Sequence, residues 1–163
     1  KKSNYFKVER NEFKYEIICD LYSKFSLAQS IIYCNSKKVV DDLSNKLNDN
    51  GYAVASIHGK MTQADRNEIM KGFRNGESRI LVSTDLLCRG IDIQQVSVVI
   101  NYDIPQNVEN YLHRIGRSGR FGRKGLAVNF MTYYDIKTLR EIEKYYSTQI
   151  QELPELDKIQ MFN

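Results

Sequence analysis

Residues 31–57, IIYCNSKKVVDDLSNKLNDNGYAVASI, contain two short apolar runs separated by a segment with helical periodicity. The apolar residues of that segment recur at every fourth position, the spacing of one helix face, at Val39, Leu43 and Leu47. Ser36 stands where a helix N-cap is expected, and Gly51 stands where the helix should end. The two apolar runs are rich in β-branched residues. The stretch therefore predicts a strand, a helix and a second strand.

The same alternation continues along the chain in both directions. Apolar runs that predict strands lie at 31–33, 54–57, 80–82, 96–100 and 127–131. Helical patterns lie at 13–25, 36–51, 62–74, 108–115 and 136–146. The first of these presents one apolar face, made of Phe13, Ile17, Leu21 and Phe25. Because the strand runs are continuously apolar, we expect helices on both faces of a mainly parallel sheet, which is the α/β class.

Polar clusters follow four of the predicted strands at their carboxyl ends. They are Asn35-Ser36, His58-Gly59, Ser83-Thr84-Asp85 and Asn101-Tyr102. In open α/β sheets, ligands bind beyond the carboxyl ends of the strands. The sequence therefore predicts one functional edge.

Composition and charge limit the classes of protein that the chain can belong to. Its 163 residues, of which 42% are hydrophobic, suit one domain with a packed core. No apolar run approaches the roughly 20 residues that a membrane-spanning helix needs, which excludes that class. The net charge of +4 favours anionic partners only mildly. The chain begins with Lys1-Lys2 rather than Met, and we expect it to be part of a longer protein.

The three cysteines are odd in number and far apart in sequence, at Cys19, Cys34 and Cys88. They match neither a disulfide framework nor a CxxC metal site. A reducing compartment is therefore the simplest expectation, and no metal site is predicted in this chain.

The most unusual segment is 113–125, in which basic residues alternate with glycines. It holds five of the 24 basic residues and four of the nine glycines. The basic residues are Arg114, Arg117, Arg120, Arg123 and Lys124. Arginines on a glycine-rich turn can present planar guanidinium groups to phosphate oxygens. The alternative is a solvated basic loop, or arginines paired with acidic neighbours.

Four sequence motifs resemble those of the DEAD-box RNA helicases, in the order of that family. HRIGRSGR at 113–120 resembles motif VI, and STD at 83–85 with RGID at 89–92 resembles motif V. IIYCNS at 31–36 resembles motif IV, and QADR at 63–66 resembles the QxxR element. The flanks look most like the translation-initiation factor 4A group. The resemblance implies that 1–163 is the second, C-terminal RecA-like lobe, a three-layer α/β/α domain, and that the first lobe is absent from this chain.

The resemblance assigns the nucleotide side of an active site between two lobes. It makes Arg117 and Arg120 arginine fingers that reach the γ-phosphate of ATP, where a fixed guanidinium stabilises the spreading transition-state charge. His113 is expected to help position that segment, and Arg114 is expected either to share this role or to anchor the structure.

The same resemblance assigns the rest of the nucleotide contacts. Asp92 is expected to accept a hydrogen bond from the ATP ribose, and Gly90 permits close backbone approach. The alternative for Asp92 is an Asx-turn. ATP is the implied cofactor, with magnesium held by the first lobe.

RNA contacts are assigned by the resemblance to residues at the strand ends and on one helix, namely Asn35, Ser36, Gly59, Arg66 and Thr84. Backbone amides, hydroxyls and an arginine can bind phosphates without reading bases. Several of these residues have structural alternatives, because Ser36 and Thr84 can cap helices and Thr62 with Asp65 forms a capping-box pattern. No aromatic stacking platform is evident, which favours recognition of single-stranded RNA without sequence preference.

Two motifs that an ATPase needs are missing from the sequence. The P-loop pattern GxxxxGK[ST] and an Asp-Glu-Ala-Asp segment do not occur. We therefore expect the chain alone to be inactive and to act as half of an ATP-dependent RNA helicase. Its implied partners are RNA, the first lobe and a translation-initiation scaffold protein, in the cytoplasm or alternatively the nucleus.

Other functions remain as alternatives. One is a non-catalytic RNA-binding or adaptor module, and another is a helicase of the exon-junction or mRNA-decay type. A Cys-His hydrolase that uses Cys34 or Cys88 with His58 or His113 is a weak third reading, because cysteine in apolar runs usually serves as a small core residue.

Overall fold

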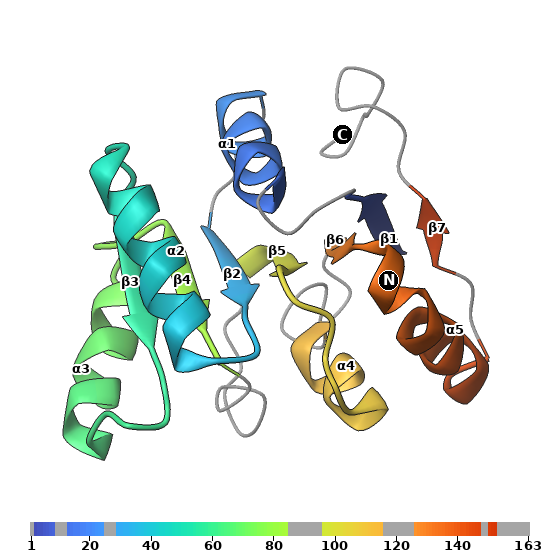
Figure 1. Cartoon of the computed structure of the whole chain (residues 1–163). Coiled ribbons are helices and arrows are strands. Elements are labelled where there is room, and N and C mark those ends of the chain that lie inside the picture. The colour runs from blue at the N-terminus through green and yellow to red at the C-terminus, as the bar shows by residue number, and fades with distance from the viewer. Residues whose placement is uncertain are drawn as a thin grey trace.

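A parallel sheet of seven strands forms the centre of the molecule (Figure 1). The structure is a computed structural model that describes residues 2–8, 13–24, 29–84, 96–115, 126–147 and 150–152. The strands are β1 (Lys2–Lys7), β2 (Gln29–Tyr33), β3 (Val54–Ile57), β4 (Ile80–Ser83), β5 (Val96–Asn101), β6 (Leu126–Met131) and β7 (Gln151–Glu152). Their order in the sheet is β3-β4-β2-β5-β6-β1-β7, and every pairing between described strands is parallel.

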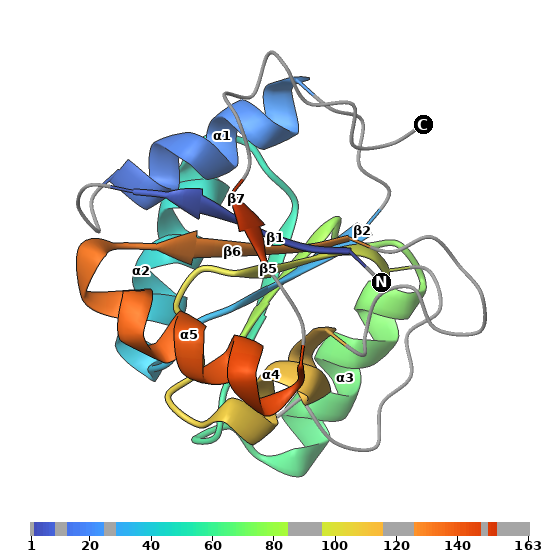
Figure 2. The ribbon, with the colours of Figure 1, turned by 90° about the vertical axis from the view of Figure 1, so that its right-hand side faces the viewer.

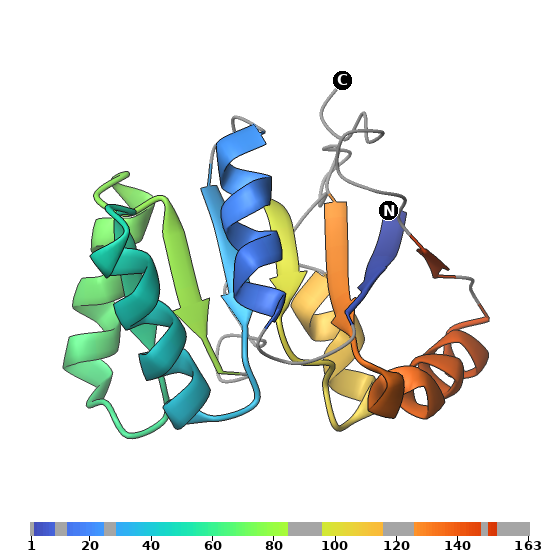
Figure 3. The ribbon, with the colours of Figure 1, turned by 45° about the horizontal axis from the view of Figure 1, so that its top comes forward.

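Helices cover both faces of this sheet and complete the three layers that were predicted (Figure 2). They are α1 (Lys14–Lys24), α2 (Lys37–Asp49), α3 (Gln63–Arg74), α4 (Val108–Ile115) and α5 (Ile136–Tyr145). A short 3₁₀ turn, Tyr133–Asp135, precedes α5. Helices α1 and α2 lie across one face (Figure 3), whereas α3, α4 and α5 lie on the other. The prediction of the α/β class with a mainly parallel sheet is confirmed.

Alternating side chains of the central strands fill the core on both faces. Ile32 of β2 packs in a cluster with α1 and α2, whereas its neighbours Ile31 and Tyr33 pack in a cluster with α3. All three are fully buried. This two-sided burial is the physical reason that the strands read as continuous apolar runs.

The sequence reasoning missed the two strands β1 and β7. The sequence of β1, KSNYFK, is mostly polar, and β7 has only two residues. Neither carries the apolar run by which the other strands were recognised. Their place in the sheet depends on the partner strand, because β1 pairs with β6 along its whole length and β7 pairs with β1.

The buried face of α1 also differs from the prediction. Lys14, Ile18 and Leu21 are buried, whereas the Phe13 side chain, just before the helix, is 40% exposed. Phe13 was therefore wrongly placed on the apolar face, and Phe25 lies outside the described residues. Separately, no helix among the described residues has the length and hydropathy to cross a bilayer.

Substitution of Phe73 and of Phe13 should distinguish a core position from a surface position. Phe73 of α3 is fully buried, and Phe73→Ala should lower the free energy of unfolding by about 3–5 kcal/mol. Phe13→Ala should lower it by about 1 kcal/mol or less. Urea denaturation followed by circular dichroism measures both values, because the chain has no tryptophan. Equal losses for the two variants would contradict this assignment of the core.

Candidate functional site

Residues that directly follow four strands lie at the carboxyl edge of the sheet. They follow β3, β4, β2 and β5, which are consecutive in the sheet. The residues at these positions are Gly59, Thr84, Asn35 and Asp103. Since parallel strands present their carboxyl ends at one edge, the structure brings together residues that are up to 68 positions apart in sequence, as the bonded pair Asn35 and Asp103 shows. This is the edge at which ligands are expected in such folds.

A fully buried arginine joins two of these loops. Arg114 lies in α4 and its side chain has no exposed surface. One terminal nitrogen donates to the backbone oxygen of Asp103 at 2.6 Å and to Oδ1 of Asn101 at 3.2 Å. The other donates to Oδ1 of Asn35 at 2.8 Å. The guanidinium carbon also lies 5.3 Å from the centroid of the Tyr33 ring, in reach of a cation–π interaction.

The loops that Arg114 joins diverge to opposite faces of the sheet. The loop after β2 leads to α2 on one face, and the loop after β5 leads to α4 on the other (Figure 2). Strand order also reverses between β2 and β5, since the chain goes from β2 toward β3 and from β5 toward β6. This is the topological switch point, where doubly wound folds bind their ligands. Here the chain's own guanidinium group bridges it.

Asn35 uses both ends of its side-chain amide inside this network. Its Nδ2 donates to the backbone oxygen of Ile104 at 2.8 Å, while its Oδ1 accepts the bond from Arg114. The backbone N–H of Asn35 donates to Oδ2 of Asp103 at 2.9 Å. The side chain therefore holds two loops together. Its assigned contact with RNA stays a prediction.

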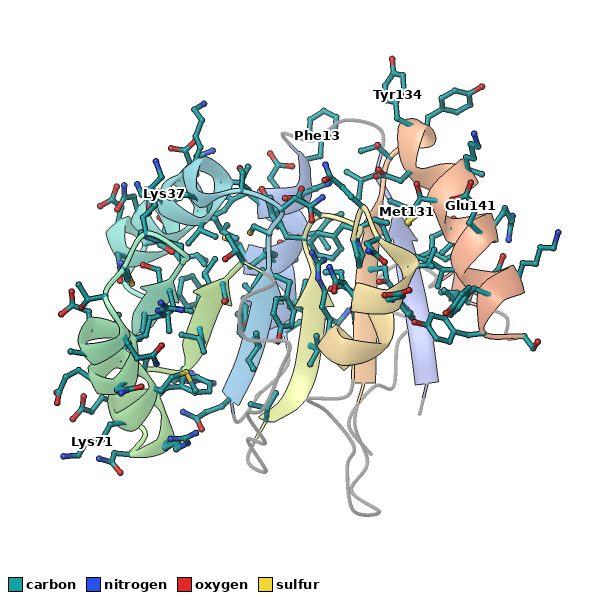
Figure 4. The ribbon with its side chains drawn as sticks, turned by 90° about the horizontal axis from the view of Figure 1, so that it is seen from below. Phe13, Lys37, Lys71, Met131, Tyr134 and Glu141 are labelled. Carbon is teal, nitrogen blue, oxygen red and sulfur yellow. The ribbon has the colours of Figure 1, made fainter. Side chains whose placement is uncertain are left out.

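Ser36 caps α2, as one of its two readings predicted. Its backbone is extended, and its Oγ accepts a hydrogen bond from the N–H of Val39 at 3.3 Å. The side chain is exposed, and the residue that follows it, Lys37, begins α2 (labelled in Figure 4). Thr62 caps α3 in the same way, accepting from the N–H of Asp65 at 3.1 Å. The cap holds the backbone at Ser36 in place and leaves the Ser36 side chain exposed.

Gly59 and Arg66 have properties that packing does not explain. A Cβ added to Gly59 would meet nothing within 4 Å, and its φ is not in the left-handed region. The fold thus does not require glycine there. Arg66, in the first half of α3, has a buried Nε with no hydrogen-bond partner among the described residues. The space above Gly59 is open, whereas the Arg66 Nε is buried and only other parts of that half-buried side chain are exposed.

Thr84 is half-buried directly after β4, and its N–H donates to the oxygen of Ile57 at 3.4 Å. It is the last described residue before 96, and its predicted capping role therefore stays a prediction. His113 lies in α4. The other residues that were assigned to nucleotide binding lie outside the described residues, namely Gly90, Asp92, Arg117 and Arg120.

The environment of Cys34 argues against the Cys-His hydrolase hypothesis. Its side chain is fully buried, and this burial raises the pKa of the thiol well above its ordinary value. A nucleophilic cysteine needs a lowered pKa and access. His58 is also nearly buried, and its Nδ1 accepts from the N–H of Lys60 at 3.2 Å. Cys88 lies outside the described residues.

Sequence reasoning missed most of the buried polar network. Nδ2 of Asn101 donates to Oδ1 of Asn129 at 2.7 Å, and Nδ2 of Asn129 donates to the Tyr111 hydroxyl at 3.2 Å. Lys14, also buried, lies 3.4 Å from Oδ1 of Asp103. Asparagines inside apolar strands were the available signal, because buried amides need partners.

Two adjacent exposed tyrosines after β6, Tyr133 and Tyr134, were also missed.

Comparison with known proteins identifies the class to which this domain belongs. The model of a family described as the helicase conserved C-terminal domain matches residues 13–122. The C-terminal domain of the DEAD-box protein Dbp5 superposes with a TM-score of 0.85 at 35% identity, over 94% of this chain and 89% of that one. The chain belongs to the helicase C-terminal domain family, as the RecA-like second lobe of the DEAD-box RNA helicases.

Within that class, the relatives include proteins named FAL1 and eukaryotic initiation factor 4A. The chain is 58% identical over 153 residues to the ATP-dependent RNA helicase FAL1 of Yarrowia lipolytica. It is 55% identical over 151 residues to eukaryotic initiation factor 4A of Caenorhabditis elegans. These matches cover 94% and 93% of this chain but only 38% of each relative. Dbp5 of S. cerevisiae bound to RNA and ADP BeF3 matches with a TM-score of 0.89 at 35% identity, over 96% of this chain and 42% of that one.

Two substitutions should separate the capping role of Ser36 from other roles. Ser36→Ala removes the cap and should lower the free energy of unfolding by about 1 kcal/mol. Ser36→Asp retains a capping oxygen and should stay within about 0.5 kcal/mol of the wild type. Urea denaturation of the chain measures both values. If alanine and aspartate are equally destabilising, the hydrogen bond to Val39 is not what fixes this loop.

Proposed function

We propose that this chain is the lobe of an ATP-dependent RNA helicase that supplies the arginine fingers and half of an RNA track. The observation that carries the proposal is the place in the sequence of the Arg-x-x-Arg pair, Arg117 and Arg120, in a chain of the helicase C-terminal domain family. It begins two residues after α4 ends, and the buried Arg114 network fixes the end of that helix. A finger must be held rigidly to stabilise transition-state charge.

On the nucleotide side, Arg117 and Arg120 bind the γ-phosphate of ATP through their guanidinium groups, and His113 helps to position them. Asp92 accepts a hydrogen bond from the ribose, and Gly90 allows the backbone to approach. The first lobe holds the β-phosphate and magnesium, because this sequence has no P-loop. Bound ATP supplies the reacting phosphoryl group, and this chain contributes charge and orientation.

On the RNA side, the track runs over the ends of three neighbouring strands. Gly59, Thr84 and Ser36 follow β3, β4 and β2, which are adjacent in the sheet. An exposed glycine with open space above it permits a phosphate to approach the backbone. Arg66 is partly exposed, and its guanidinium group carries the positive charge that a phosphate contact uses. Asn35 contributes by holding its loop and through its exposed surface.

The relatives support a role in translation initiation, since eukaryotic initiation factor 4A is among them. We infer that the protein works in the cytoplasm, with a first RecA-like lobe and a translation-initiation scaffold protein as partners. We infer that 1–163 is the helicase C-terminal lobe and expect it to fold without the first lobe. Binding of ATP and RNA draws the two lobes together over this edge.

Removal of either finger should abolish most turnover. In a two-lobe protein that contains this chain, Arg117→Ala or Arg120→Ala should lower RNA-stimulated ATP turnover by about 10³-fold or more. RNA affinity without nucleotide should change far less, because the fingers contact the other ligand. Arg123→Ala removes the same charge from the same segment and serves as the control. If turnover of both finger variants stays within about threefold of the wild type, the assignment fails.

The RNA contact of Arg66 can be tested by its salt dependence. Arg66→Ala should weaken binding about equally for different single-stranded sequences and reduce the slope of log affinity against log salt by about 0.7. Lys71→Ala removes one charge from the same helix at its opposite end, away from Lys37 and the carboxyl edge (Figure 4), and should leave the slope nearly unchanged. Fluorescence anisotropy in several salt concentrations measures both. An altered sequence preference with an unchanged slope would indicate base recognition instead.

A further inference from the structure

Two adjacent tyrosines project from the carboxyl edge of the sheet. Tyr133 and Tyr134 belong to the 3₁₀ turn that follows β6, and they are 82% and 89% exposed. Figure 4 shows Tyr134 pointing away from the sheet at the same edge as Lys37. Such exposed rings add little to the core, and adjoining exposed apolar groups are typical of an interaction site.

The turn holds the two rings in place without burying them. The backbone N–H and the hydroxyl of Thr132 both donate to Oδ2 of Asp135, at 2.9 and 3.0 Å. The N–H of Asp135 donates in return to the backbone oxygen of Thr132 at 3.0 Å. The centroids of the two tyrosine rings are 5.9 Å apart, and the ring planes meet at 82°. The backbone is therefore fixed before a ligand binds, which lowers the entropy cost of binding.

We propose that Tyr133 and Tyr134 form a stacking platform for the bases of single-stranded RNA, beside the proposed phosphate track. This inference rests on the proposed RNA-binding function and deepens it. Only β5 separates β6 from β2 in the sheet. The strand that leads to the platform thus lies about 10 Å across the sheet from the strand that leads to Ser36. One RNA strand can therefore reach both.

The chemistry of this surface favours bases over a protein partner. A ring with exposed faces can stack on any base, because every base has a π-face. Lys137 is exposed one turn into α5 and adds a positive charge for an adjoining phosphate. The exposed residues that follow along α5 are charged, namely Arg140, Glu141 and Lys144, whereas the centre of a protein interface is poor in charge. RNA recognition stays independent of sequence, as expected, but extends beyond the RNA backbone.

A single tryptophan tests the base contact directly. The chain contains no tryptophan, so Tyr134→Trp places one fluorophore on the platform. Tyr145→Trp is the matched control, because Tyr145 is 59% exposed at the far end of α5. Single-stranded oligoadenylate should quench the fluorescence of Tyr134→Trp, since stacked bases quench indole, and should leave Tyr145→Trp unchanged. An abasic oligomer of the same length should quench neither.

Affinities in the two-lobe protein give a second, independent measurement. The double variant Tyr133→Ala/Tyr134→Ala should keep the wild-type melting temperature, because neither side chain is buried. It should bind oligoadenylate about tenfold more weakly or worse, as expected for two lost stacking contacts. The slope of log affinity against log salt should not change, because no phosphate contact is lost. Tyr145→Ala should bind as the wild type does.

Three results would overturn the platform. They are wild-type affinity of the double variant for oligoadenylate, an unquenched Tyr134→Trp, and an equal loss of affinity for the abasic oligomer. A double variant that keeps its RNA affinity but no longer binds the separate first lobe would assign this surface to a protein contact instead.

The outcome also separates this inference from the proposed function. If the wild type binds neither oligomer, the RNA-binding function itself is refuted. If the wild type binds both and only Arg66→Ala changes the affinity and its salt slope, the phosphate track stands and the platform alone fails.

Discussion

The carboxyl edge of this domain depends on the burial of one guanidinium group. Arg114 has no exposed surface, and a charged group taken from water is tolerated only when its hydrogen bonds are replaced. Asn35, Asn101 and the backbone of Asp103 supply acceptors. The loops after β2 and β5 must therefore adopt positions that satisfy the arginine. This requirement fixes the two loops where they meet at the carboxyl edge.

The topology of the sheet explains why this group lies where it does. Loops diverge between β2 and β5 because α2 and α4 cover opposite faces. Divergence at this point leaves room that a ligand fills in many doubly wound folds. In this domain a side chain bridges it, and the residues proposed for RNA lie beside it, over β2, β4 and β3. The proposed finger segment follows α4 in the sequence, and Arg114 is the penultimate residue of that helix.

Much of this architecture could be predicted from sequence, because burial on both faces produces continuous apolar runs. The five strands predicted at such runs are present, and Ser36 caps its helix as its spacing suggested. The mostly polar β1 could not be recognised from its sequence, because this segment is a strand through its pairing with β6. The Arg114 network was also beyond sequence reasoning, since its members come from segments as far apart as Asn35 and Arg114. The assigned roles in nucleotide and RNA binding rest on motif resemblance and remain predictions.

The division of the active site between two lobes is tested by the RNA-dependent ATP turnover of this chain alone and of the same chain tethered to a P-loop lobe. The chain alone should show no hydrolysis above background, because nothing in it holds the γ-phosphate at the guanidinium groups. Tethering the first lobe by its natural linker should restore RNA-dependent turnover, and mixing untethered lobes should restore much less. Robust RNA-stimulated hydrolysis by the purified chain alone, abolished by Arg117→Ala, would contradict the division of the active site between two lobes.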